Sequence, residues 1–185
     1  VVWQDFRDVG TGEIYYRNLE ETGTGVRRLT ENRYGQFHPV IYDFWVVWQD
    51  NRDLQVDLYG YDLRRDREVR LTDTPENETR PYLEGPWVVC EEDSLSVDST
   101  NLRLIHLDNL RAMPLTRSES FKERPALAGG AVVWQDTEAG RVRVRSAPLP
   151  TAQAVFENQN AVAVTGAMST FLTDAYTLLT EWSET

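Results

Sequence analysis

Acidic side chains follow a repeated phrase in this sequence, and their oxygens could bind a cation. The phrase VVWQD occurs at Val1–Asp5, Val46–Asp50 and Val132–Asp136. Weak metal-ligand candidates are the carboxylates that end its first two copies and those that follow closely: Asp5, Asp8, Asp50, Asp53 and Asp57. Hard oxygen ligands of this kind suit calcium. No loop has the D-x-[DN]-x-[DN]-G spacing of a calcium loop, so calcium is a minor alternative.

The same carboxylates have a structural interpretation. In QDFRD and QDNRD the Asp can cap a turn, while Arg7 or Arg52 pairs with it locally. We favour this interpretation, and assign no metal ligand and no cofactor. Other acidic residues are expected on the same rim and would make one face attractive to a basic partner: Glu91, Glu92, Asp93 and Asp136, with Asp73, Glu76 and Glu78.

Catalytic motifs are not recognisable. The two histidines, His38 and His106, lie in different parts of the repeat, and there is no G-x-S-x-G. His38 is expected as a turn residue. The only cysteine, Cys90, stands where other repeats have tryptophan and is expected as a small buried hydrophobe. One cysteine also leaves no internal disulfide, Cys-based zinc site or C-x-x-C-H haem attachment, so the sequence predicts no enzyme within this chain.

The charge and hydropathy exclude several partners. A net charge of -11 argues against nucleic acid, whose binders gather Lys and Arg against phosphates. No stretch approaches the roughly 20 apolar residues of a membrane span. The first residues also lack the basic-then-apolar plan of a signal peptide, so we expect any export signal to have been removed or never present.

The phrase recurs at a regular interval. With VVCEE at Val88–Glu92 as a fourth copy, the starts Val1, Val46, Val88 and Val132 are separated by 45, 42 and 44 residues. Pro39, Pro81 and Pro125 each precede the next VV by seven residues, and RLT or PLT ends at Thr30, Thr72 and Thr116. This period is typical of four-stranded propeller blades.

Each unit contains four short strand-like runs. The first follows the proline, as in VIYDFW, and the second is VVW, apolar on both faces like a strand between two sheets. The third alternates, as in LRLIHL, and the fourth carries arginines suited to an outer edge, as in EVRLT. A sheet of this size must stack on copies of itself, which predicts an all-β propeller of about four blades.

These phrases resemble the TolB-like (WD40-like) β-propeller repeats of secreted bacterial and archaeal proteins. Val46–Pro81 follows the repeat's order of a VVWQD strand, a YGYDL strand, an RLT strand and a proline nearly throughout. The resemblance covers about Val1–Val155. It implies an extracellular, periplasmic or cell-surface location, and a role as binding platform, peptidase-associated domain or lyase scaffold.

The two ends of the chain differ from the repeat. The chain starts at the second strand of its first blade, and NAVAVTGA at Asn160–Ala167 aligns with RPALAGGA at Arg124–Ala131. That segment could supply the missing strand, begin a fifth blade or pair with a neighbouring molecule. We therefore divide the chain into propeller repeats over 1–159 and a closing or assembling segment over 160–185.

A short amphipathic helix is predicted near the C-terminus, because apolar residues between 171 and 182 share one helical stripe. A degenerate strand is the alternative. The candidate interaction residues of this segment are Val162, Val164, Phe171, Leu172, Leu178, Leu179 and Trp182.

The sequence thus favours a non-catalytic extracellular propeller that binds a protein partner or assembles with itself through its open terminal blade. The alternative is the accessory propeller of a larger secreted hydrolase or lyase.

Overall fold

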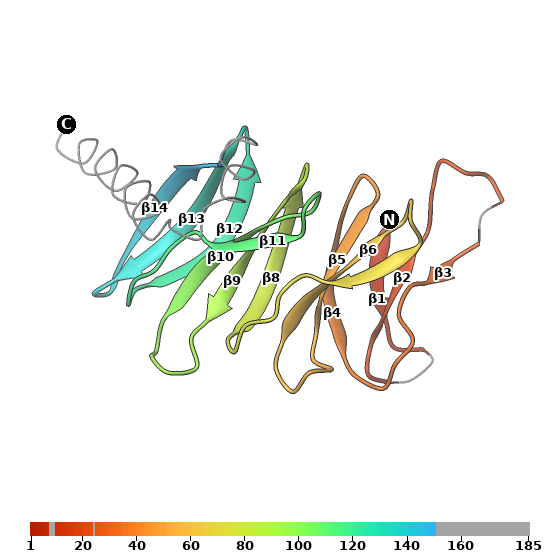
Figure 1. The fold of residues 1–185 in the computed structure, drawn as a ribbon, viewed down its shortest axis with the longest axis horizontal. Coiled ribbons are helices and arrows are strands. Elements are labelled where there is room, and N and C mark those ends of the chain that lie inside the picture. Colours follow the sequence, from red (N-terminus) through yellow and green to blue (C-terminus); the bar gives the residue numbers. More distant parts are fainter. Residues whose placement is uncertain (8–9, 24, 151–185) are drawn as a thin grey trace. The chain divides into compact units, whose positions relative to one another are not determined.

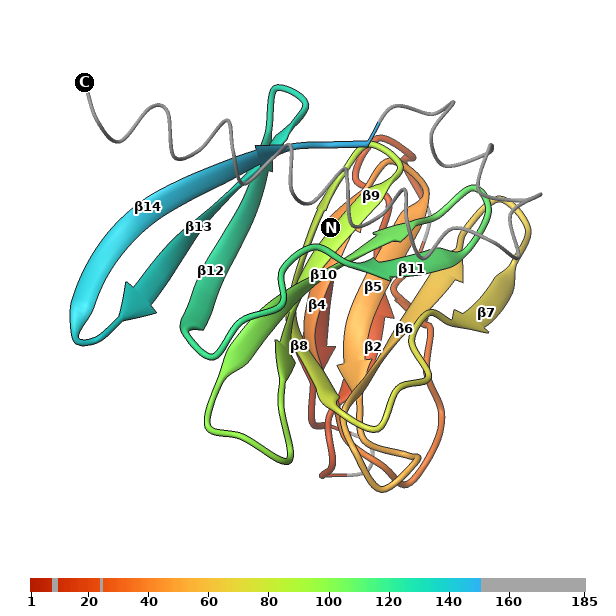
Figure 2. The same cartoon turned by 60° about the vertical axis from the view of Figure 1, so that its left-hand side comes forward.

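The computed structural model describes residues 1–7, 10–23 and 25–150, which form fourteen β-strands (Figure 1). The first sheet has the order β1-β2-β3 and the second β4-β5-β6-β7, and all their pairs are antiparallel. Their strands are β1 (Val2–Asp5), β2 (Glu13–Tyr16), β3 (Arg27–Arg28), β4 (Gln36–Tyr42), β5 (Trp45–Asp50), β6 (Asp57–Asp62) and β7 (Arg67–Arg70). Figure 2 shows β7 at the edge of its sheet, next to β6.

The third and fourth repeats form the remaining strands. β8, β9, β10 and β11 pair in order and antiparallel. β12 pairs antiparallel with β13, and β14 is the next strand of the sheet. One parallel pair, Thr100 with Phe121, joins β10 to β12. The strands are β8 (Asn77–Glu84), β9 (Trp87–Asp93), β10 (Thr100–His106), β11 (Arg111–Pro114), β12 (Phe121–Ala128), β13 (Ala131–Glu138) and β14 (Arg141–Pro148).

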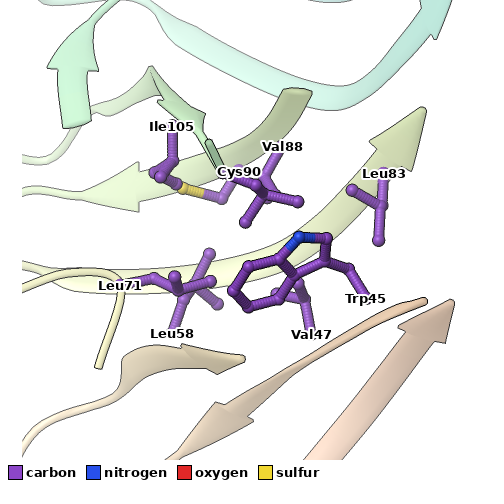
Figure 3. Close-up of a cluster of buried hydrophobic side chains, with 9 residues drawn as sticks. Trp45, Val47, Leu58, Leu71, Leu83, Val88, Cys90 and Ile105 are labelled. Carbon is purple, nitrogen blue, oxygen red and sulfur yellow. The ribbon is translucent and has the colours of Figure 1, made fainter. Parts of the chain in front are cut away.

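The VVWQD strand of the second repeat is buried on both faces, as its sequence predicts. All six residues of β5 are buried. Trp45 and Val47 join a cluster with the third sheet, whereas Val46 and Trp48 join a cluster with the first. Because side chains alternate along a strand, a single apolar run packs against the sheets on both sides. In Figure 3 Trp45 and Val47 lie among side chains of the first of these clusters, which include Leu58, Leu83 and Cys90.

The repeated RLT has a structural role at the outer strand. Its threonine hydroxyl accepts a hydrogen bond from a backbone N–H of the third strand in each of three repeats, which ties the outer edge to the blade. The pairs are Thr30 with Ile14 at 2.8 Å, Thr72 with Leu58 at 2.9 Å and Thr116 with Leu102 at 2.9 Å.

The predicted start of the inner strand is wrong. The strand was expected to begin after the proline, but β4 begins at Gln36, three residues before Pro39. A bulge between Phe37 and Val40 lets the strand continue pairing past the proline, which has no N–H to donate. β8 and β12 likewise begin before their prolines and contain an equivalent bulge.

Fold class is confirmed as all-β, in the described residues, with four-stranded blades in the second and third repeats. Over the same residues no helix is long and apolar enough to cross a membrane. The predicted helix, the segment 160–185 and its candidate interaction residues lie outside the described part of the chain.

Candidate functional site

Three inner strands share an unusual backbone conformation immediately before a proline. His38, Arg80 and Arg124 have φ angles of 50°, 49° and 54°. Residues other than glycine seldom adopt positive φ, and such strain persists only where the surroundings enforce it. Each lies within a register shift of β4, β8 or β12 against its neighbour. The threefold recurrence identifies the bulge as a built feature of the repeat, which we call the X-Pro bulge.

Side chains of the preceding blade hold two of these bulges. The side-chain Oε1 of Gln49, in β5, accepts the backbone N–H of Arg80 at 3.0 Å. Oε1 of Glu91, in β9, accepts the N–H of Arg124 at 2.7 Å. Gln49 and Glu91 occupy the same position of the repeated phrase, and this position connects the second blade to the third and the third blade to the fourth. The sequence interpretation had placed Glu91 on an exposed acidic rim, and that placement is wrong because its side chain is only 1% exposed.

The X-Pro bulges line a common pocket of about 330 Å³. Its walls are the three X-Pro dipeptides together with Val40 and Tyr82. The prolines, Val40 and the tyrosine ring are apolar, and the only titratable side chains besides Tyr82 are His38, Arg80 and Arg124. A pocket with apolar walls and few polar groups is the usual form of a ligand site. His38, expected in a turn, therefore lies instead in a strand bulge at this pocket.

The two arginines differ in their surroundings. Nη1 of Arg80 lies 2.5 Å from Oε2 of Glu91, although 62% of the Arg80 side chain is exposed. No carboxylate of the described residues forms an ion pair with Arg124, which is exposed. The residues that line the pocket therefore include one arginine paired with a carboxylate and one arginine that has no ion pair with any described carboxylate, and no acidic residue.

A layer of buried polar side chains lies two residues before the bulges. The equivalent positions hold Gln36, Glu78 and Lys122. Burial raises the pKa of Glu78 to about 7, while the hydroxyl of Thr74 donates to its Oε1. Burial lowers the pKa of Lys122, whose Nζ donates to Ser120 at 2.6 Å. Glu78 was expected on the exposed rim, and its complete burial contradicts that expectation.

The acidic residues of the first two repeats make mainly local contacts. In the second repeat, Asp50 is fully buried and accepts hydrogen bonds from Trp48 Nε1 at 3.2 Å and from the Arg52 backbone at 3.0 Å. Burial alone would lower the pKa of Arg52, but hydrogen bonds to Asp50 and Glu68 raise it. The first repeat has the same arrangement around Asp5, and its hydrogen bond from Arg7 lowers the pKa of that carboxyl.

The remaining metal candidates also have partners. Asp53 accepts from the Tyr59 hydroxyl at 2.7 Å, and buried Asp57 pairs with Arg70 at 2.8 Å. Asp8 lies outside the described residues. In the part of the chain that the structure describes, no three His, Cys, Asp or Glu side chains are grouped so as to hold a metal. The calcium alternative stays a prediction.

Part of the expected acidic rim is internal. Asp136 is buried and pairs with Arg145 at 2.6 Å, and Glu92 pairs with Arg103. The loop after the second VVWQD does lie beside the segment before Pro81, as expected for parts of one rim: Val56 donates its N–H to the Asn77 side chain at 2.8 Å. Asp73 remains largely exposed beside Arg70.

The cysteine and the second histidine are both buried. Cys90 is completely buried in the cluster of Figure 3, as expected, and burial raises the pKa of its thiol. His106 is buried with its ring 4.6 Å from that of Trp87, and burial lowers its pKa. The sequence reasoning missed the X-Pro pocket, although the alignment of His38, Arg80 and Arg124 before proline was a usable signal.

Neither a protein-family model nor a curated protein matches the sequence. Among solved structures, a candidate TolB from Agrobacterium tumefaciens has a TM-score of 0.59 and 20% identity over 78% of this chain and 56% of its own. TolB from Acinetobacter baumannii has a TM-score of 0.57 and 10% identity, over 76% of this chain and 36% of its own.

A third similar structure is a puromycin-hydrolyzing peptidase from Mycobacterium tuberculosis. Its TM-score is 0.59 at 13% identity, over 76% of this chain and 24% of the peptidase. This chain thus spans about half, or less, of the length of the three structures. Its fold is the TolB-like β-propeller fold that the repeated phrases predict.

Proposed function

We propose that this chain is a non-catalytic, exported β-propeller module that binds a protein partner at the X-Pro pocket. The proposal rests on one observation: three successive inner strands each have a bulge at the equivalent position, and all three bulges line one pocket. Bulges and positive φ angles gather at functional sites, where the backbone must aim particular side chains. Export is supported by the resemblance of the repeats to those of secreted proteins.

A non-catalytic role is supported by the use of the acidic side chains. The buried carboxylates of Asp50 and Glu91 hold a turn and a neighbouring strand, respectively. Asp57 is paired with Arg70. These groups stabilise the fold, and none of them lines the X-Pro pocket.

Selection of peptides from a random displayed library against the purified 185-residue chain tests the proposal. The informative variant is Tyr82→Ala, because Tyr82 lines the pocket and is 42% exposed. Tyr42→Ala is the matched control, since Tyr42 lies on inner strand β4, is 45% exposed and is not part of the pocket lining. Selected peptides should bind the Tyr42 variant normally and lose binding to the Tyr82 variant. Failure to select any peptide, or equal binding by both variants, would contradict the proposal.

The second candidate is the accessory propeller of a larger secreted hydrolase or lyase. The similarity to a peptidase of which this chain covers 24% favours it. The mass and terminal sequences of the native protein decide this point: a longer chain with a hydrolase segment supports the accessory role.

If the chain assembles with itself through the first blade, its protein partner is a second copy of the same chain. Within the described residues, β1 pairs only with β2 and is therefore an edge strand, which can accept a strand from another molecule. Light scattering gives the native mass of the chain and of a variant lacking 160–185. If this segment donates the strand, its removal abolishes assembly and leaves the first three repeats folded. Normal assembly of the shortened chain would contradict strand donation.

A further inference from the structure

We infer that the X-Pro pocket binds a carboxylate group carried on an apolar body, with the guanidinium of Arg124 as its main partner. The inference rests on the proposed function, since it names the chemistry that a partner would present to the same pocket. The group could be the C-terminal carboxylate of a peptide or the side chain of an internal Glu.

The charge of the pocket selects an anion. The chain has a net charge of -11, yet the lining holds two arginines and one histidine and no acidic side chain. Arg80 is already paired with Glu91 at 2.5 Å, whereas no ion pair links Arg124 to a carboxylate of the described residues. An arginine fork matches a carboxylate in a bidentate arrangement.

The backbone of Arg124 is held in place before any ligand binds. Its N–H donates to buried Glu91 at 2.7 Å, and Pro125 follows it directly. The proline fixes its own φ, and the hydrogen bond fixes the bulge, so little backbone freedom is lost when the side chain binds. The same Glu91 carboxylate binds both the Arg80 guanidinium and the Arg124 backbone, and thus positions both arginines.

The walls of the pocket favour an apolar body beside the anion. The apolar part of the lining consists of the rings of Pro39, Pro81 and Pro125 together with Val40 and Tyr82. A volume of about 330 Å³ lies at the lower end of ligand pockets, as expected for a side chain or a small terminal residue. The guanidinium of Arg124, which pairs with no carboxylate of the described residues, balances one negative charge, so a monoanionic carboxylate fits better than a phosphate dianion.

Amide NMR spectra of the full chain, titrated with N-acetyl-leucine, test the inference. The expected result is a saturable shift of the Val40, Tyr82 and Arg124 amide signals, which N-acetyl-leucine amide does not produce. Arg124→Gln should weaken binding roughly tenfold to a hundredfold, the range for hydrogen bonds to charged groups. Arg141→Gln is the control, because Arg141 is an exposed arginine of β14 outside the pocket, and its loss changes the net charge equally.

Other probes distinguish the sources of the anion. N-acetyl-glutamate amide offers only a side-chain carboxylate, so its affinity relative to N-acetyl-leucine separates an internal Glu from a chain terminus. Tighter binding of inorganic phosphate at the same amides would overturn the choice of carboxylate. Equal binding of the acid and the amide, or unchanged binding by the folded Arg124→Gln variant, would overturn the inference. The proposed function would still stand if library peptides lose binding to the Tyr82→Ala variant but bind equally well after C-terminal amidation and after Arg124→Gln.

Discussion

The buried carboxylate of Glu91 accepts the backbone N–H of Arg124 at 2.7 Å, although 33 residues separate the two in sequence. The contact crosses from the VVCEE strand of one blade to the inner strand of the next. Gln49 and Arg80 form the equivalent contact one repeat earlier, at 3.0 Å. One position of the repeated phrase therefore links successive blades and shapes the pocket.

Replacement of Glu91 separates its hydrogen-bonding role from its charge. Glu91→Gln keeps an acceptor, as Gln49 does, and loses an ion pair with the exposed Arg80, so it should cost less than about 1 kcal/mol of unfolding free energy. Glu91→Ala leaves the N–H of Arg124 without its acceptor and should cost about 1 to 3 kcal/mol. Urea unfolding followed by tryptophan fluorescence measures both. Equal costs would show that the ion pair, rather than the backbone contact, provides the stability.

Removal of the carboxylate at Asp50 should be far more damaging than the equivalent change at Asp5. Asp50 is fully buried and accepts from Trp48 and from both the backbone and the guanidinium of Arg52, so Asp50→Ala should cost at least roughly 3 kcal/mol. Asp5 makes the same contacts in the first repeat, but 57% of the Arg7 side chain is exposed. Asp5→Ala should therefore cost clearly less in the same unfolding assay. Similar costs would mean that the motif stabilises each blade independently of burial.

Glu78 should make the stability of the protein depend on pH. Its pKa is about 7 in the folded protein against 4.5 ordinarily, and burial is the main cause. Below 4.5 it is protonated in both states; as the pH rises toward 7, the unfolded chain loses the proton first. Stability should therefore fall by roughly 3 kcal/mol across this interval, and stay constant above it with respect to this group.

The variant Glu78→Gln isolates that contribution. Gln36 occupies the equivalent position in the preceding repeat, so an amide is compatible with this site. The difference in unfolding free energy between the variant and the original chain should grow from pH 4.5 to 7 in favour of the variant. Parallel pH curves would contradict the assignment. The other groups that shift the pKa of Glu78 are Thr74, Thr72, Arg103 and Asp57, and they are unchanged in this comparison.

The thiol of Cys90 should react only when the protein opens. It is completely buried between two sheets, and burial raises its pKa well above the ordinary value. An aromatic disulfide reagent should label it slowly in buffer and rapidly in denaturing urea. Labelling in buffer at the rate of a free thiol would contradict the packing of this cluster.

Much of the fold could be predicted from the sequence. The regular spacing of VVWQD, RLT and proline gave the all-β propeller, because each landmark is a local requirement of one strand. The apolar run Val46–Trp48 predicted a strand buried on both faces, and its alternate residues do enter two different clusters. The local pairing of Asp50 with Arg52 was also predictable, since the two residues are neighbours in one turn.

The sequence therefore predicts the content and order of the blades, whereas contacts between distant strands determine which polar residues are buried and which groups they bind. Glu91 and Glu78 look like other acidic residues in sequence, but contacts with strands about 30 and 25 residues away give them internal positions. The X-Pro pocket likewise exists only because three inner strands bulge toward a common space. Burial and pocket shape depend on contacts between strands that lie 25 or more residues apart, within a blade for Glu78 and between blades for Glu91, and a local stretch of sequence does not contain those contacts.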